Sequence, residues 1–117
     1  MSVTPFEQLA NLDRRIHDPA RLAILTALSA CERADFLFLQ RITGLTKGNL
    51  SSHLSKLEEA GLVEIEKRFV DKKTQTLVRL SRAGRQTIES YWQEMEELRE
   101  SAARWPLQNA VPVPSPG

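Results

Sequence analysis

A run of small polar side chains between residues 46 and 62 offers the clearest chemistry in this chain. Hydroxyl, amide and ammonium groups can donate hydrogen bonds to phosphate oxygens and to the edges of bases. The free N–H groups of a helix's first turn also suit a phosphate. Double-stranded DNA is therefore the leading partner for this segment, and an ordinary solvated surface helix is the alternative. The residues that carry these groups are Thr46, Lys47, Gly48, Asn49, Ser51, Ser52, His53, Ser55 and Lys56.

The same segment has the apolar spacing of a helix over residues 46–60. Leu50, Leu54 and Leu57 recur at i, i+4 and i+7, which places them on one narrow stripe. Thr46 can cap the start of this helix, and a glycine follows its predicted end. The pattern predicts a helix that three leucines hold to a core while its polar groups face outward.

Two residues of this helix have competing interpretations. Gly48 costs about 1 kcal/mol relative to Ala inside a helix. Close approach of the backbone to DNA would explain that cost, and relief of crowding near Phe36 or Leu39 is the alternative. His53 lies at the edge of the leucine stripe, so it either donates to a phosphate or packs as a structural side chain.

Three apolar patterns precede this helix. Residues 5–16 and 36–43 have helical spacing, whereas residues 20–30 are apolar nearly all round, as in a buried central helix. Residues 33–35 offer either a short edge strand or a second helix cap. The 36–43 helix, a Gly-Leu turn and the 46–60 helix together predict a helix-turn-helix.

The apolar period then changes to two, which predicts a β-hairpin, or wing, with its tip at residues 70–75. Val63, Ile65 and Phe69 alternate with polar residues as in a half-buried strand, and a turn over residues 71–74 follows. Cations at such a tip can enter or straddle a minor groove. The alternative to a role in DNA binding is that these lysines keep the exposed strand edges from pairing with another chain. The hairpin carries a cluster of five cations, Lys67, Arg68, Lys72, Lys73 and Arg79, and the ones assigned to DNA here are Arg68, Lys72 and Lys73.

A long helix, capped by Ser81 and reaching about residue 104, ends the predicted fold. Its apolar residues recur every three or four positions in a seven-residue repeat. The small core cannot cover so long a stripe, and monomers avoid large exposed apolar patches. We therefore predict a homodimer that uses this helix and the N-terminal helix. The predicted interface residues are Phe6, Leu9, Leu12, Ile88, Tyr91, Trp92, Met95, Leu98 and Ala102.

Length, charge and cysteine content limit the class of protein. The 117 residues suffice for one domain, predicted over residues 1–105, and the proline-rich residues 106–117 are predicted to be disordered. Residues 41–85 carry ten Lys/Arg against five Asp/Glu, whereas residues 86–104 carry two against five. The basic part suits DNA and the acidic part a separate role. A single cysteine and the lack of a ~20-residue apolar run predict a cytoplasmic protein without a membrane partner.

The motif over residues 44–63, GLTKGNLSSHLSKLEEAGLV, resembles a pattern of the ArsR/MarR-like superfamily of winged-helix regulators. The pattern, G-L-(S/T)-x-G-N-L-S-x-H-L-x-x-L-E-x-A-G-(L/Y)-V, marks a small subgroup, whose strand-to-helix step is similar to residues 80–85. The resemblance covers roughly residues 18–95. It implies a mainly α fold with a β-hairpin wing (α+β), a winged helix-turn-helix with a long C-terminal dimerisation helix. It also implies a prokaryotic, dimeric regulator whose 46–60 helix enters the major groove.

The sequence thus predicts a DNA-binding transcription regulator, with a repressor of a near-palindromic operator as the first expectation. Many ArsR-like sensors carry a Cys-x-Cys or His/Asp ligand cluster, which this chain lacks, so no metal or other cofactor is expected. No catalytic triad or phosphate-cradling loop is present, and an enzyme is not expected. Two alternatives remain. One is a protein-interaction module that binds no DNA. The other is a switch that senses an unidentified small molecule or the redox state of Cys31.

Overall fold

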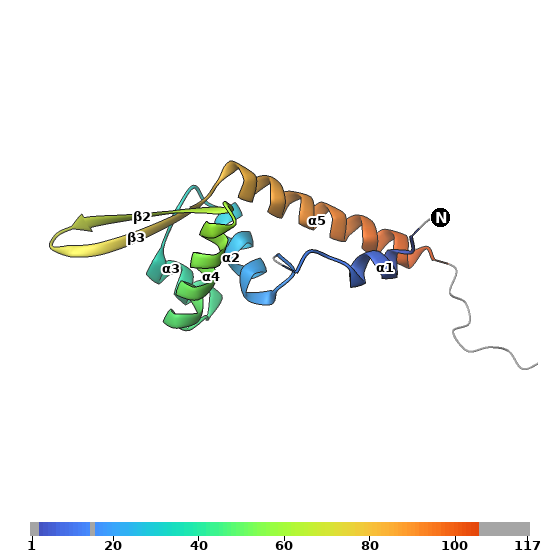
Figure 1. Cartoon of the computed structure of the whole chain (residues 1–117), viewed down its shortest axis with the longest axis horizontal. Helices are drawn as coiled ribbons and strands as arrows, with labels where there is room; N and C mark the ends of the chain where they lie inside the picture. The colour runs from blue at the N-terminus through green and yellow to red at the C-terminus, as the bar shows by residue number, and fades with distance from the viewer. Residues whose placement is uncertain (1–2, 15, 106–117) are drawn as a thin grey trace, which may run out of the picture.

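The structure, a computed structural model, describes residues 3–14 and 16–105. Within these ranges the chain forms five α-helices and a three-stranded antiparallel sheet (Figure 1). The disorder predicted for residues 106–117 concerns a segment outside the described residues. The elements are α1 (Pro5–Ala10), α2 (Pro19–Ser29), β1 (Ala34–Asp35), α3 (Phe36–Thr43), α4 (Lys47–Glu59), β2 (Val63–Val70), β3 (Lys73–Leu80) and α5 (Arg82–Ala103).

Local capping chemistry sets where the helices begin. The side chain of Asp18 accepts a hydrogen bond from the Arg21 N–H at 3.1 Å before α2. Thr46 accepts from the Asn49 N–H at 3.1 Å before α4, and Ser81 caps α5 in the same way. Each bond satisfies a backbone donor that has no partner inside its own helix. The predicted caps of these helices are confirmed.

Asp35 is both a strand residue and a helix cap, so both interpretations of this segment hold. It pairs with β3 as part of β1, and its carboxylate accepts from the Leu37 N–H at 2.7 Å to begin α3. The Gln75 amide donates to the same carboxylate at 3.1 Å. These hydrogen bonds lower the pKa of Asp35 because they stabilise its charged form, and the bond from Gln75 has the largest effect.

The sheet order is β1-β3-β2, and β2 and β3 form the wing. Near the body, Val63 and Val78 of the wing are buried at 3% and 0% exposure. Phe69, further along β2, is 72% exposed, so the predicted half-buried strand does not extend that far. The reason is that the wing projects past α3 and α4, which cover only its proximal half (Figure 1).

The wing ends in a two-residue turn rather than the predicted turn over residues 71–74. Lys73 pairs with Val70, which leaves only Asp71 and Lys72 between the strands. Both turn residues have positive φ, 50° and 65°. That combination defines a type I′ turn, whose twist matches that of the flanking strands.

The end of α4 and the start of α5 meet at one corner. Gly61, at φ 76°, ends α4 in a Schellman arrangement, with the Leu62 N–H donating to the Leu57 carbonyl at 2.9 Å. The Leu62 carbonyl then accepts from the Ser81 N–H at 3.0 Å. Gly84 allows this approach, because a Cβ there would lie only 1.9 Å from the Leu62 oxygen. Any larger residue at position 84 must displace the start of α5.

The core lies between α2, α3, α4, the proximal wing and α5. Its side chains come from every one of these elements, so the helix-turn-helix and the wing form one packed unit. The largest fully buried side chains are Ile24, Leu25, Leu28, Leu39, Leu50, Leu57, Val78 and Ile88.

The N-terminal helix is shorter than the predicted helix over residues 5–16. It ends at Ala10, where Asn11 acts as C-cap and its side chain donates to the Glu7 carbonyl at 2.8 Å. Leu12 and Ile16 still pack against the core, but from a turn that leads into α2. Their helical spacing therefore reflects burial rather than a continuing helix.

The long stripe on α5 is largely covered within one chain, which reduces the surface left for the predicted dimer, and the dimer itself stays a prediction. Ile88, Tyr91 and Leu98 are only 1%, 7% and 4% exposed. The cover comes from α2 and from α1, which lies along the C-terminal half of α5 (Figure 1). These three residues need no partner chain. Trp92, at 47% exposure, and Phe6, at 40%, keep accessible apolar surface.

Candidate nucleic-acid interface

Three buried leucines set the orientation of α4. Leu50, Leu54 and Leu57 are at most 2% exposed, which confirms the predicted apolar stripe. Their burial turns the other faces of the helix to solvent. Eight of the nine residues assigned to DNA in this segment are exposed, namely Thr46, Lys47, Gly48, Asn49, Ser51, Ser52, Ser55 and Lys56.

The crowding explanation for Gly48 is wrong. A Cβ built at Gly48 meets no atom within 4 Å, so Phe36 and Leu39 leave room for a side chain there. The glycine therefore lowers helix propensity without any packing reason inside the chain. Close approach of an external partner to the first turn of α4 remains the hypothesis that explains it.

His53 is half-buried and turned toward α2. The Arg21 Nε–H donates to His53 Nδ1 at 3.4 Å. The contact supports the structural interpretation of this side chain.

A groove of about 530 Å³ separates α4 from the wing. Lys47, Ser51 and Ser55 line the side of the groove formed by α4, and Lys67 and Thr76 line the side formed by the wing. Two ammonium groups and three hydroxyl groups thus face one concave surface, together with the carboxylate of Glu58 near the end of α4. Such a surface suits the sugar–phosphate backbone of a nucleic acid.

Lys67 and Thr76 are absent from the residues that we assigned to DNA from the sequence. The signal for Lys67 was present, because it follows Ile65 by two positions and so shares its face of the strand. Thr76 could be placed only through the strand register, in which it lies opposite Lys67. That register depends on a two-residue turn that the sequence did not reveal.

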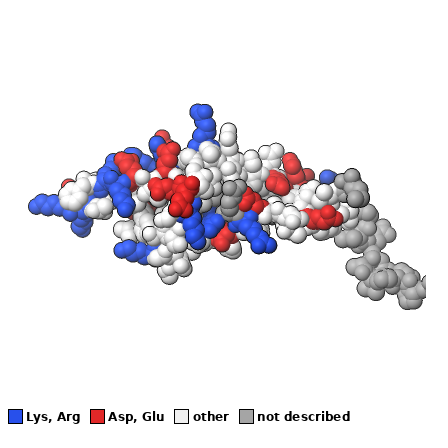
Figure 2. All heavy atoms as spheres, in the orientation of Figure 1, with Lys and Arg blue, Asp and Glu red and all other residues white. Residues whose placement is uncertain are grey.

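The predicted wing cations divide between the tip and the outer face. Lys72 and Lys73 are exposed at the turn, and Arg68 lies opposite Gln75 on the face away from the groove. Figure 2 shows Lys and Arg side chains over the projecting end of the wing, whereas Asp and Glu side chains gather at the base of the wing and toward the α1–α5 end. The basic surface is therefore concentrated at the tip of the wing.

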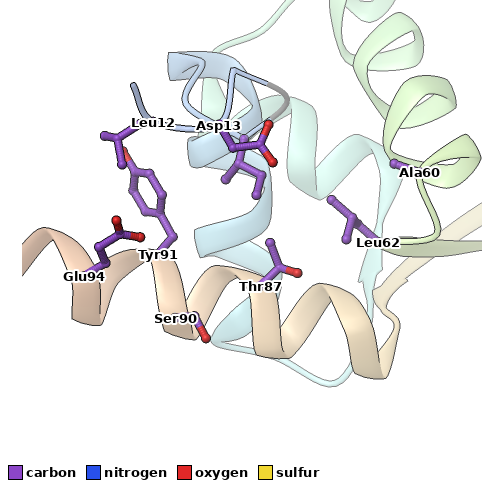
Figure 3. Close-up of a pocket in the computed structure, with 9 residues that line it drawn as sticks. Leu12, Asp13, Ala60, Leu62, Thr87, Ser90, Tyr91 and Glu94 are labelled. Atoms are coloured by element: carbon purple, nitrogen blue, oxygen red, sulfur yellow. The ribbon is translucent and has the colours of Figure 1, made fainter. Parts of the chain in front are cut away.

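A second cavity, of about 440 Å³, lies between α5, the segment after α1 and the end of α4 (Figure 3). The Tyr91 hydroxyl in its wall is hydrogen-bonded to His17 Nδ1 at 2.7 Å. Burial, and then the charge of Glu94, raise the pKa of Tyr91. An occupant would touch both the middle of α5 and the end of α4. The lining residues are Leu12, Asp13, Ile16, Ala60, Leu62, Thr87, Ser90, Tyr91 and Glu94.

An apolar groove of about 460 Å³ follows the outer face of α5. Four residues from the predicted dimer interface line it: Leu9, Trp92, Met95 and Ala102. The Trp92 indole is held in place because its N–H donates to the Thr26 hydroxyl at 3.0 Å. This groove is the part of the predicted interface that remains open to a partner chain.

Cys31 is half-buried, and its thiol donates to the Ala27 carbonyl at 3.6 Å. Over residues 3–14 and 16–105, no group of three or more His, Cys, Asp or Glu side chains is placed to hold a metal ion. In the same ranges no helix is long and apolar enough to cross a bilayer.

The helix-turn-helix, the basic wing and the long final helix define a winged-helix DNA-binding fold, as the sequence predicted. Residues 20–99 match the family described as winged helix DNA-binding domain. This match spans more than half of the chain and includes α4 and both wing strands. The chain belongs to this family.

Known proteins agree with this assignment. The chain is 35% identical over 81 residues to the uncharacterized protein MJ0432 of Methanocaldococcus jannaschii, covering 69% of this chain and 88% of that protein. It is also similar to the structure of a transcriptional regulator homologue from Pyrococcus horikoshii OT3, with 26% identity and a TM-score of 0.76 over 84% of this chain and 96% of that one. A mutant MarR from E. coli shares the fold, with 23% identity and a TM-score of 0.67 over 88% of this chain and 74% of that one. The predicted resemblance to winged-helix regulators is confirmed, while the narrower subgroup motif stays a prediction.

Proposed function

We propose that this protein is a non-enzymatic, sequence-specific transcription regulator that inserts α4 into the major groove of duplex DNA. The observation that carries the proposal is the exposed polar face of α4 beside a groove where Lys47, Lys67 and three hydroxyl side chains outnumber the one carboxylate of Glu58. The family assignment supports DNA as the partner.

The side chains divide into those that position the duplex and those that read it. The first-turn N–H groups, with Lys47 and Asn49, suit a phosphate, because the positive end of the helix points at it. Lys72 and Lys73 hold a neighbouring phosphate strand through the wing. Ser52 and Ser55 lie further along α4 and meet base edges. Phosphate contacts position the protein, and base contacts specify the site.

The regulator acts as a homodimer on a near-palindromic operator. The open groove lined by Leu9, Trp92, Met95 and Ala102 offers apolar surface at the end of the molecule away from the wing. Two chains joined there present two α4 helices to successive major-groove faces, about 34 Å apart. The acidic side chains of α5 favour this arrangement, because they keep the joined ends away from phosphate.

Repression is the proposed outcome, because a dimer that covers an operator excludes other proteins from the same duplex. The cavity between α5 and the end of α4 is the proposed effector site. A small molecule bound there would favour one angle between the dimerisation end of each chain and its α4 helix. It would thereby change the spacing of the two α4 helices.

Selection of bound sites from a random duplex library tests the proposal. We expect a two-fold symmetric site with half-sites about one helical turn apart. Ser52→Ala should relax the preference at one base position per half-site, at a cost of about 1–3 kcal/mol, with little change in thermal stability. Failure to enrich any sequence would refute sequence-specific binding.

The wing is tested separately by replacing Lys72 and Lys73 together by Ala. Since each lost phosphate contact removes about 0.9 from the log–log salt slope, the dimer's slope should become shallower by a few units. Affinity should fall alike for all sequences. A protein-interaction module that binds no DNA would instead show no salt-dependent duplex binding for the wild type either.

A further inference from the structure

Phe69 is an aromatic side chain that the fold leaves in solvent. It is 72% exposed and lies two residues before the type I′ turn, in the part of the wing that projects past α3 and α4 (Figure 1). Exposure of a single apolar side chain is ordinary. The position of this one on the wing carries the argument.

The pairing register places Phe69 on the face of the wing that borders the groove. Residues opposite each other in an antiparallel pair share a face, and the faces alternate along each strand. Ile65 and Lys67 line the groove beside α4, so Phe69 continues the same face, opposite Thr74. At about 3.3 Å per residue the ring lies about 7 Å beyond Lys67, further out along the wing. A duplex seated on α4 passes this face of the wing.

The surroundings of the ring are basic and the turn is conformationally defined. Residues 67–73 contain Lys67, Arg68, Lys72 and Lys73 against the single acid Asp71. The two positive-φ turn residues hold the strand ends in one register. An apolar ring among several cations is complementary to a polyanion that has an apolar interior between its charged strands. Duplex DNA, viewed from its minor groove, is such a partner.

We propose that Phe69 is an apolar wedge that enters the minor groove beside each half-site and selects deformable base steps there. The inference rests on the proposed DNA-binding function and assigns a reading residue to the wing, separate from α4. Apolar side chains inserted at a base step partially unstack it and kink the duplex. Flexible pyrimidine–purine steps such as TA and CA/TG oppose this deformation least. The flanks of the operator are therefore read through deformability rather than through hydrogen bonds.

A wedge differs from a phosphate contact in its salt dependence. Phe69 carries no charge, so its removal lowers affinity without changing the number of neutralised phosphates. The salt slope should stay constant, in contrast to the effect of the double lysine replacement. The loss should also depend on the flanking sequence, being larger on duplexes with TA or CA/TG flanks than on duplexes with stiff A-tract flanks.

Phe69→Thr and Val70→Thr form a matched pair of variants. Threonine is β-branched and is favoured in strands, as phenylalanine and valine are, so the hairpin should persist in both. Val70 is 44% exposed and lies opposite Lys73 on the other face of the wing. Both variants lose apolar surface at the tip, but only Phe69→Thr removes it from the groove-side face.

The experiment uses the full chain and duplexes enriched from the random library, with 2-aminopurine placed at successive flanking positions. We expect Phe69→Thr to weaken binding about ten-fold or more, equivalent to about 1.4 kcal/mol, with an unchanged salt slope. Wild type should raise 2-aminopurine fluorescence at one flanking step, and Phe69→Thr should abolish that rise. Val70→Thr should behave as wild type, and both variants should unfold at the wild-type temperature.

Each contrary result has a distinct meaning. Equal affinity and equal fluorescence for wild type and Phe69→Thr would overturn the wedge while leaving the proposed function intact. A fall in sedimentation mass for Phe69→Thr alone would show that the ring contacts a second copy of the chain instead, and would also overturn it. If the wild type enriches no duplex, the proposed function fails and the wedge fails with it.

Discussion

Replacement of Gly48 by Ala separates the stability of α4 from its contact with DNA. Gly48 is the second residue of the helix, after Thr46 as N-cap, and a Cβ there has no neighbour within 4 Å. The added methyl group meets no steric resistance inside the chain. The substitution should therefore stabilise the protein by up to about 1 kcal/mol, because Ala has the higher helix propensity. For a domain of this size that corresponds to a rise in Tm of up to about 4 °C.

The same methyl group should weaken DNA binding. If the first turn of α4 lies against a phosphate, a Cβ that projects from it forces the duplex to retreat. Loss of one charge-assisted hydrogen bond costs about 1.5–3 kcal/mol, or roughly ten- to a hundred-fold in affinity for each half-site. We thus expect a protein that melts at a higher temperature and binds its operator more weakly.

Thermal unfolding and fluorescence anisotropy with the enriched duplex measure the two effects on one preparation. A Gly48→Ala variant that is more stable and binds as tightly as the wild type would refute the close approach of this turn to DNA. A variant that is less stable would refute the reasoning about open space around the glycine.

Three further predictions concern the scaffold. Gly84→Ala should destabilise the protein by about 2–4 kcal/mol in chemical denaturation, because its Cβ would lie 1.9 Å from a backbone oxygen; an unchanged midpoint contradicts the close packing of α5. Met95→Glu should convert a dimer to a monomer in sedimentation, whereas Gln93→Glu at an exposed position of α5 should leave the dimer intact. If the two variants sediment with equal masses, the α5 groove is not part of the interface. Because folding lowers the pKa of Asp35, its stabilising contribution is complete above the unfolded pKa and is lost as pH falls through the folded value. Asp35→Asn should therefore flatten the loss of Tm below about pH 4, and a variant with the wild-type acid profile contradicts this.

The helices and their starts could be predicted because caps depend on neighbours in the chain. Asp18, Thr46 and Ser81 each accept from an N–H three residues ahead, a contact that needs no tertiary information. The leucine stripe of α4 was predictable for a similar reason, since the eight residues from Leu50 to Leu57 contain all three of its leucines.

The type of turn at the tip of the wing was not predictable, because its two central residues are not a pair that favours this conformation. Type I′ turns favour Asn-Gly or Asp-Gly, whereas here Lys72 adopts positive φ without the freedom of glycine. The resulting register decides which side chains face the groove. Lys67 and Thr76 were missed, and Phe69 was placed in a half-buried strand, because the register and the reach of the wing beyond the helices are tertiary properties.

The cover of α5 also depends on tertiary structure. The repeat of Ile88, Tyr91 and Leu98 is compatible with a partner chain or with neighbours in the same chain, and periodicity alone does not distinguish them. The chain folds α1 back along α5, so intrachain packing takes most of the stripe. Among the described residues of the predicted interface, those around Trp92 and Met95 line an open groove, and Phe6 also keeps exposed apolar surface.

The dependence of duplex affinity on salt tests the central claim most directly. A dimer in which α4 and the wing neutralise about six to eight phosphates should give a log–log slope near −5 to −7, at roughly −0.9 per contact. The measurement is an anisotropy titration of the enriched duplex and of a random duplex at several salt concentrations. We expect steep slopes for both and tighter binding to the enriched duplex. Duplex affinity that is absent, or that does not fall as salt rises, would contradict the assignment of this surface to DNA.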